Sequence, residues 1–280
     1  MVVKVTETVT EQPTVTGTEN KETVKMLTTI ADLRTAAAED DFNIVVGADL
    51  EETGNGVVML QISKAGKIDL NGHTLKAVSD VLFVNGTKVE ISGSGLIQST
   101  GDCAIWGDYG ADITISDINV KAQEAALLIQ RASKLTVKSG TFETVDNFVV
   151  GTNGSNGRGS NVITIDGGTF NGNIQSAGYI ACGIYLANSD TLTVNGGTFN
   201  ITNGCGILAR SGHTTVGKDV VINLANDANN QAQGKVGDSK VMVLTGAYIV
   251  KDNAAHYPGG EPSVTNNSIY SVTELNEYKA

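Results

Sequence analysis

Two nearly identical phrases decide the fold: Ile163-Thr-Ile-Asp-Gly-Gly-Thr-Phe-Asn171 and Leu192-Thr-Val-Asn-Gly-Gly-Thr-Phe-Asn200. A third copy, Leu135-Thr-Val-Lys-Ser-Gly-Thr-Phe-Glu143, lies upstream, and weaker copies occupy residues 89–97 and 113–121. Self-similarity at intervals of roughly 20 to 30 residues is the signature of a repeat architecture, in which each repeat is one small structural unit. The chain is therefore predicted to be one continuous array of such units.

Each repeat contains short strands in which apolar and polar residues alternate. In Leu192-Thr-Val194 the leucine and valine point to one side and the threonine to the other, because successive side chains of a strand alternate. Short strands at this spacing suit a coil in which each turn stacks on the previous one. The sequence thus predicts an all-β, single-stranded parallel β-helix. One strand of each turn is expected near Ile68, Val89, Ile113, Leu135, Ile163, Leu192 and Val220.

Equivalent positions in stacked turns should place equivalent side chains on top of one another inside the coil. The expected internal ladder consists of Phe142, Phe170 and Phe199, preceded by Leu96 and by Ile118 or Val120. The pairs Gly167-Gly168 and Gly196-Gly197 are expected at the bend between two faces, where a backbone with positive φ is needed.

The chain is predicted to have three parts. Residues 1–26 are too polar to form a core, and we interpret them as an extended arm that orders only against a partner or the main body. The alternative is a tail without a role. Residues 27–250 form the β-helix, and residues 251–280 form a tail that either caps the coil or pairs with a neighbouring subunit.

A short amphipathic helix is predicted over residues 29–39, before the repeats begin. Thr29 and Asp32 resemble a capping box at its start. One helical face carries Ile30, Leu33 and Ala37. This helix is expected to cap the other end of the coil, because exposed strand edges need covering.

Composition excludes several classes of function. The chain of 280 residues carries a formal charge of −11, which argues against a nucleic-acid partner, since phosphate binding needs clustered lysine and arginine. No stretch is long and apolar enough to predict a membrane span. The N-terminus lacks the basic and apolar regions of a signal peptide, so assembly in a cytosol is expected.

The three cysteines begin related phrases. Cys103-Ala-Ile-Trp, Cys182-Gly-Ile-Tyr and Cys205-Gly-Ile-Leu are expected at equivalent positions, which would hold the thiols inside as small apolar groups. An odd number of cysteines without an export signal argues against a disulfide framework. Because no Cys-x-x-Cys or Cys-His spacing accompanies them, we expect no metal site and no cofactor.

The phrases Ile68-Asp-Leu-Asn-Gly-His-Thr-Leu75 and Ile163-Thr-Ile-Asp-Gly-Gly-Thr-Phe170, preceded by a helix, resemble the pectate-lyase-like right-handed parallel β-helix superfamily. Within it, the Gly-Thr-Phe repeats of gut bacteria and their phages are most similar, over roughly residues 28–250. The resemblance implies a right-handed coil, in keeping with the general preference for right-handed crossovers. That superfamily includes polysaccharide lyases, glycoside hydrolases, phage tailspikes and non-enzymatic virion proteins, so the motifs indicate the fold and leave the activity open.

The segment most similar to a binding site is residues 104–112. An aromatic beside carboxylates suits a sugar, so the candidate ligand-binding residues are Trp106, Asp108, Tyr109 and Asp112. Glycoside hydrolysis requires paired carboxylates. In the alternative of an enzyme, the catalytic residues would be Asp108 and Asp112. Turn chemistry alone also explains aspartates at such positions, as it does for Asp102, Asp117, Asp166 and Asp190.

The other chemistry-bearing residues give weaker signals. The histidines, His73, His213 and His256, show no spacing that indicates catalysis, and the basic residues Arg131, Arg158 and Arg210 belong to separate units. His73 and His213 share a phrase typical of a turn. The glycine-rich residues 153–160 lack the Gly-Lys-Ser/Thr ending of a phosphate loop, so we interpret them as a projecting loop able to contact a partner.

These observations favour a non-enzymatic structural protein of a bacteriophage virion, such as a head fibre, capsid decoration or tail appendage, whose arm docks on other virion proteins. Contact with host-surface glycans is a further expectation, and the resemblance implies a homotrimer. The alternatives are a polysaccharide lyase, a glycoside hydrolase or a glycan-binding module, and a secreted adhesin if an export signal precedes this sequence.

Overall fold

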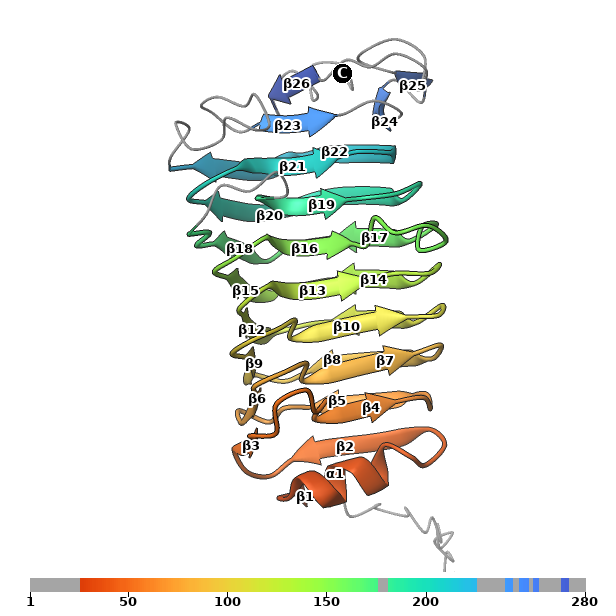
Figure 1. Ribbon diagram of the computed structural model, residues 1–280, viewed down its shortest axis with the longest axis vertical. Coiled ribbons are helices and arrows are strands. Elements are labelled where there is room, and N and C mark those ends of the chain that lie inside the picture. The colour runs from red at the N-terminus through yellow and green to blue at the C-terminus, as the bar shows by residue number, and fades with distance from the viewer. Residues whose placement is uncertain are drawn as a thin grey trace, which may run out of the picture.

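The computed structural model describes residues 26–175 and 181–225, together with four strands at 240–243, 247–251, 254–256 and 268–271. These residues form a parallel β-helix of about 8 turns, 55% strand, with a short helix near the N-terminus (Figure 1). The predicted fold class is confirmed. Residues 1–25 of the predicted arm and most of the predicted tail lie outside the described residues.

Two sheets run along the length of the coil. Typical turns contribute two strands to the larger sheet and one to the smaller. The larger sheet contains β1 (Met26–Leu27), β2 (Phe42–Val46), β3 (Leu50–Glu52), β5 (Gly66–Asp69), β6 (Thr74–Ala77), β8 (Lys88–Ser92), β9 (Leu96–Ser99), β11 (Asp112–Ile115), β12 (Ile118–Ala122), β14 (Lys134–Val137), β15 (Gly140–Thr144), β17 (Val162–Ile165), β18 (Thr169–Gly172), β20 (Thr191–Ile201), β22 (Gly212–Leu224), β24 (Ala247–Lys251) and β25 (Ala254–His256). The smaller sheet contains β4 (Leu60–Ile62), β7 (Leu82–Asn85), β10 (Ile105–Asp108), β13 (Ala125–Ile129), β16 (Phe148–Thr152), β19 (Cys182–Leu186), β21 (Cys205–Ala209), β23 (Lys240–Val243) and β26 (Ser268–Ser271).

The register of the stacked turns follows the repeat through the middle of the coil and departs from the prediction at both ends. Ile163 pairs with Leu192 as expected. Near the start, however, Ile68 pairs with Ile91 rather than with Val89. Near the end, Leu192 pairs with Thr214 rather than with Val220. Val220 lies later in the same strand and pairs with Gly197. Turn length therefore varies more than the repeated phrase indicates.

The phenylalanine ladder is confirmed. Phe142 and Phe170 stack with ring centroids 5.0 Å apart and Phe170 and Phe199 with centroids 4.5 Å apart, all three fully buried. Val120 precedes Phe142 in the ladder. The prediction of Leu96 was wrong, because Ile97 pairs with Val120 and is the buried member of that turn.

The predicted bend glycine is also confirmed. Gly168 has φ 113°, a conformation that side chains rarely adopt, and a Cβ there would lie 3.1 Å from the carbonyl oxygen of Gly140 in the previous turn. Gly197 repeats this geometry one turn later, with φ 112°. Gly168 and Gly197 therefore allow the backbone to bend and allow neighbouring turns to approach closely.

The helix α1 (Ile30–Ala36) lies at the N-terminal end of the coil (Figure 1). Thr29 is its N-cap, and its side-chain oxygen accepts a hydrogen bond from the Asp32 amide at 3.1 Å, as the capping pattern predicts. Leu33 and Ala37 are buried in the core. No helix within the described ranges is long and apolar enough to cross a membrane.

At the C-terminal end, parallel stacking gives way to antiparallel pairing. β26 pairs antiparallel with β23, and β25 pairs antiparallel with β24. Each of these strands covers an edge that a further parallel turn would otherwise occupy.

Candidate functional site

The smaller sheet carries a second apolar surface, separate from the core. In β13, Leu127 and Ile129 belong to the core, whereas Leu128 between them packs against a different cluster. Because side chains alternate along a strand, Leu128 faces outward. The residues in register with it form an outer row: Phe83, Trp106, Leu128, Gly151, Tyr185 and Leu208.

The cysteines belong to this outer cluster. All three cysteines are buried and none forms a disulfide, as predicted, and Cys182 pairs in register with Cys205. The expectation that they lie in the interior was wrong, because they pack with Ala125, Phe148 and their neighbours rather than with the core. Burial and the adjacent Cys205 raise the pKa of the Cys182 thiol well above its ordinary value, so this thiol stays protonated.

A groove of about 430 Å³ lies over the outer cluster. Phe148 and Tyr185, stacked with ring centroids 5.4 Å apart, contribute to its apolar part together with Leu128. Its polar part includes Glu124 and Arg210, and the Nη1 of Arg210 donates a hydrogen bond to the Tyr185 hydroxyl at 3.0 Å. The remaining lining residues are Cys103, Ala125, Asn147, Thr152, Asn153, Gly154 and Ser155. This volume lies within the range of small-ligand sites.

The predicted loop at residues 153–160 borders this groove through Asn153, Gly154 and Ser155. Asn188 fastens the loop, since its Nδ2 donates to the carbonyl oxygen of Ser155 at 3.0 Å. The sequence indicated a projecting loop here but gave no indication of the groove beneath it.

Trp106 lies on the same outer face. Its ring and that of Phe83 are 5.0 Å apart between centroids, and the indole Nε1 is buried without a hydrogen-bond partner in the described structure. A buried donor of this kind is a group that a bound acceptor would satisfy.

Asp108 is buried among charged and hydrogen-bonding partners. Its side chain is 2% exposed and accepts hydrogen bonds from the Gln130 Nε2 at 2.7 Å and the Tyr109 amide at 2.8 Å, and it pairs with Arg131. Arg131 also lies over the Tyr109 ring, 4.2 Å from its centroid. Gln130 in turn accepts a hydrogen bond from Arg158. The carboxylate is thus neutralised and enclosed.

The four predicted binding residues do not converge on one cluster. Asp112 begins β11 in the larger sheet, where it pairs in register with Lys88 and Lys134, whereas Trp106 and Asp108 belong to β10 of the smaller sheet. Tyr109, 59% exposed and with φ 54°, stands at the turn between the two strands.

Other predicted polar residues are used in hydrogen bonds between turns. Asp117 accepts from the Ser139 hydroxyl at 2.7 Å, and Asp166 accepts from the Asn195 amide at 2.7 Å. Asp190 is buried and accepts from the Thr152 hydroxyl at 2.7 Å. His73 lies 3.4 Å from an Asp49 oxygen, and the ring of His213, in a strand rather than a turn, lies 3.2 Å from the Thr191 hydroxyl.

A column of acidic residues lies beside the groove, and the sequence indicated only one of them, Asp102, as a turn aspartate. Asp80, Asp102 and Glu124 come from three successive turns, where the chain enters β7, β10 and β13. Burial, and then the charge of Asp102, raise the pKa of Glu124. The sequence feature that could have indicated this column is the shared position of its members, just before each apolar strand of the smaller sheet.

Comparisons with protein-family models, with curated proteins and with solved structures find no match to this chain.

Proposed function

We propose that this chain is a non-enzymatic structural β-helix whose outer groove binds carbohydrate, and that it forms an appendage or decoration of a bacteriophage virion. The observation that carries the binding role is the groove over the smaller sheet, with aromatic and aliphatic side chains beside Glu124 and Arg210. Sugar rings present apolar C–H faces and polar hydroxyl edges, and such a mixed surface complements both.

The environment of Asp108 argues against its use as a general acid or base. A general acid or base must reach the atom whose proton it transfers. The Asp108 carboxylate is instead enclosed and paired with Arg131 and Gln130, and Asp112 belongs to a different sheet. The virion role, the homotrimer and the docking of residues 1–26 are supported by the resemblance of the repeat phrases.

Binding is tested with the purified full-length chain on an array of bacterial-surface oligosaccharides, followed by calorimetric titration of the sugars retained. Gly154→Ala places a methyl group in the groove, where its Cβ would meet Ala187 at 3.4 Å, and Arg210→Gln removes a positive charge from the groove. Each change should weaken binding about 10-fold, the cost of a lost charged hydrogen bond or a steric contact. The matched control is Lys134→Gln, on an exposed residue of the larger sheet.

Equal binding by all three variants would exclude the groove as the site. Depolymerisation of a capsular or cell-wall polysaccharide would favour the enzymatic alternative, and loss of that activity in Asp108→Asn or Asp112→Asn would place its catalytic site. The virion role is tested by the mass of the protein in solution and by locating residues 1–26 in an assembled particle. A monomer whose arm contacts nothing contradicts it.

A further inference from the structure

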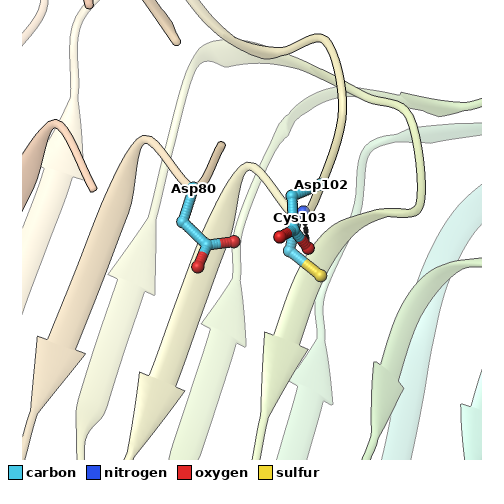
Figure 2. A group of neighbouring side chains, drawn as sticks. All are labelled: Asp80, Asp102 and Cys103. Atoms are coloured by element: carbon cyan, nitrogen blue, oxygen red, sulfur yellow. Dashed lines mark hydrogen bonds between the residues drawn. The ribbon is translucent and has the colours of Figure 1, made fainter. Parts of the chain in front are cut away.

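Three potential metal-ligating side chains lie together at one end of the smaller sheet, in two neighbouring turns. Asp80 stands before β7, and Asp102 with Cys103 stands before β10 (Figure 2). One ligand atom from each residue lies within 4.8 Å of the other two. The turns are held together by hydrogen bonds from the Val81 and Leu82 amides to the carbonyl oxygen of Ala104, at 3.2 and 3.0 Å.

The Asp80 side chain is the observation that points to a ligand. The residue is 6% exposed, and its Oδ1 is buried without a hydrogen-bond partner among the residues that the structure describes. Nearly all buried polar atoms in proteins are hydrogen-bonded, and an unpaired buried carboxylate oxygen is costly. An ion bound among these side chains would supply the missing partner.

Asp102 is held in a defined position. The Asp102 amide donates a hydrogen bond to the Ser99 Oγ at 3.0 Å, and the Asp102 Oδ1 accepts one from the Cys103 amide at 2.9 Å. The Ser99 hydroxyl donates in turn to the carbonyl oxygen of Ser79 at 2.8 Å. In metal sites, hydrogen bonds of this kind to the ligand residues hold the ligands in the orientation that the metal requires.

The local charges also favour a cation. Burial, and then the charge of Asp102, raise the pKa of Asp80 to about 7. Burial, and then Asp80 and Asp102, raise the pKa of the Cys103 thiol far above its ordinary value. A divalent cation reverses both effects, because it stabilises adjacent carboxylates and deprotonates a thiol that coordinates it.

We propose that Asp80, Asp102 and Cys103 form a binding site for a divalent transition-metal ion, with Zn²⁺ as the representative. Ca²⁺ and Mg²⁺ take oxygen ligands only, whereas Zn²⁺ accepts cysteine sulfur together with carboxylate oxygen. Three protein ligands leave one position of a tetrahedral ion for water or another ligand. Because Cys103 also lines the groove, the metal site adjoins it, but the inference does not depend on carbohydrate binding.

The test uses the full chain without a polyhistidine tag, treated with chelator and titrated with Zn²⁺, Co²⁺, Ca²⁺ and Mg²⁺. We expect one Zn²⁺ per chain, release of the thiol proton, and a thiolate-to-metal charge-transfer band in the near-ultraviolet spectrum of the Co²⁺ form. Ca²⁺ and Mg²⁺ should bind at least about 100-fold more weakly than Zn²⁺, since neither ion uses the sulfur.

Matched variants identify the ligands. Cys103→Ser should abolish the charge-transfer band, and Asp80→Asn should weaken Zn²⁺ binding by about 100-fold while preserving side-chain volume. Cys205→Ala removes a buried thiol of the same outer cluster and should change neither readout. Circular dichroism establishes that each variant is folded. Absence of Zn²⁺ binding, a band that persists in Cys103→Ser, or unchanged affinity in folded Asp80→Asn would overturn the proposal.

Discussion

Removing the central ring of the phenylalanine ladder should destabilise the coil more than removing an outer ring. Replacing a buried phenylalanine by alanine costs about 3–5 kcal/mol, of which each aromatic pair accounts for about 0.5–1.5 kcal/mol beyond area burial. Phe170 stacks on both Phe142 and Phe199, whereas Phe142 has Val120 on its other side. Phe170→Ala should therefore lower the free energy of unfolding by about 1 kcal/mol more than Phe142→Ala.

The assay is equilibrium unfolding in urea, followed by far-ultraviolet circular dichroism and by the fluorescence of Trp106, the single tryptophan. Two probes are needed because stacked turns can unfold in parts, and coincident transitions justify a single free energy. The double variant completes a cycle whose expected coupling between Phe142 and Phe170 is about 1 kcal/mol. Equal costs for the two single variants, together with no coupling, would refute the argument that ring stacking across turns stabilises this core.

Two further predictions concern charge and backbone. Because the pKa of Asp80 is raised from 3.8 to about 7, the folded protein keeps a proton that the unfolded chain releases. In chelator-treated protein the free energy of unfolding should fall by on the order of 2–4 kcal/mol between about pH 4 and pH 7, and then level off. Urea unfolding across this pH range should show that Asp80→Asn removes this fall in the free energy of unfolding, and that the variant is more stable than the unmodified protein at pH 8. An equal fall in both proteins would contradict the role of Asp80. Gly168→Ala, at φ 113°, should cost about 1–3 kcal/mol, whereas Gly154→Ala, without positive φ, should change stability by less than about 1 kcal/mol in thermal unfolding. Equal stability of the two variants would show that the bend does not require glycine.

The interior of the coil was predictable because it depends on local patterns. Alternation within each short strand indicates which side chains face inward, and repetition places Phe142, Phe170 and Phe199 on top of one another. The helix start at Thr29 followed from capping chemistry between residues close in sequence. Leu96 shows the limit of this reasoning, since a one-residue difference in register exchanges the inward and outward positions.

The candidate site was not predictable in the same way. Asp108 was recognised as a carboxylate beside aromatic residues, but Arg131, which neutralises it, comes from the next turn. Asp80 was not recognised, because its neighbours Asp102 and Cys103 also lie one turn away and no short motif joins the three. Closely spaced cysteine and histidine residues, the usual sequence sign of a metal site, are therefore absent from this cluster.

Alternating strands and a recurring Gly-Thr-Phe phrase were sufficient to specify a parallel β-helix with a stacked aromatic core, since each turn buries the same side chains on the one before. Tertiary structure decided which residues of successive turns meet on the outside. Loop lengths differ between turns, and only the hydrogen-bonded register fixes the alignment that assembles the groove and places Asp80 beside Asp102 and Cys103.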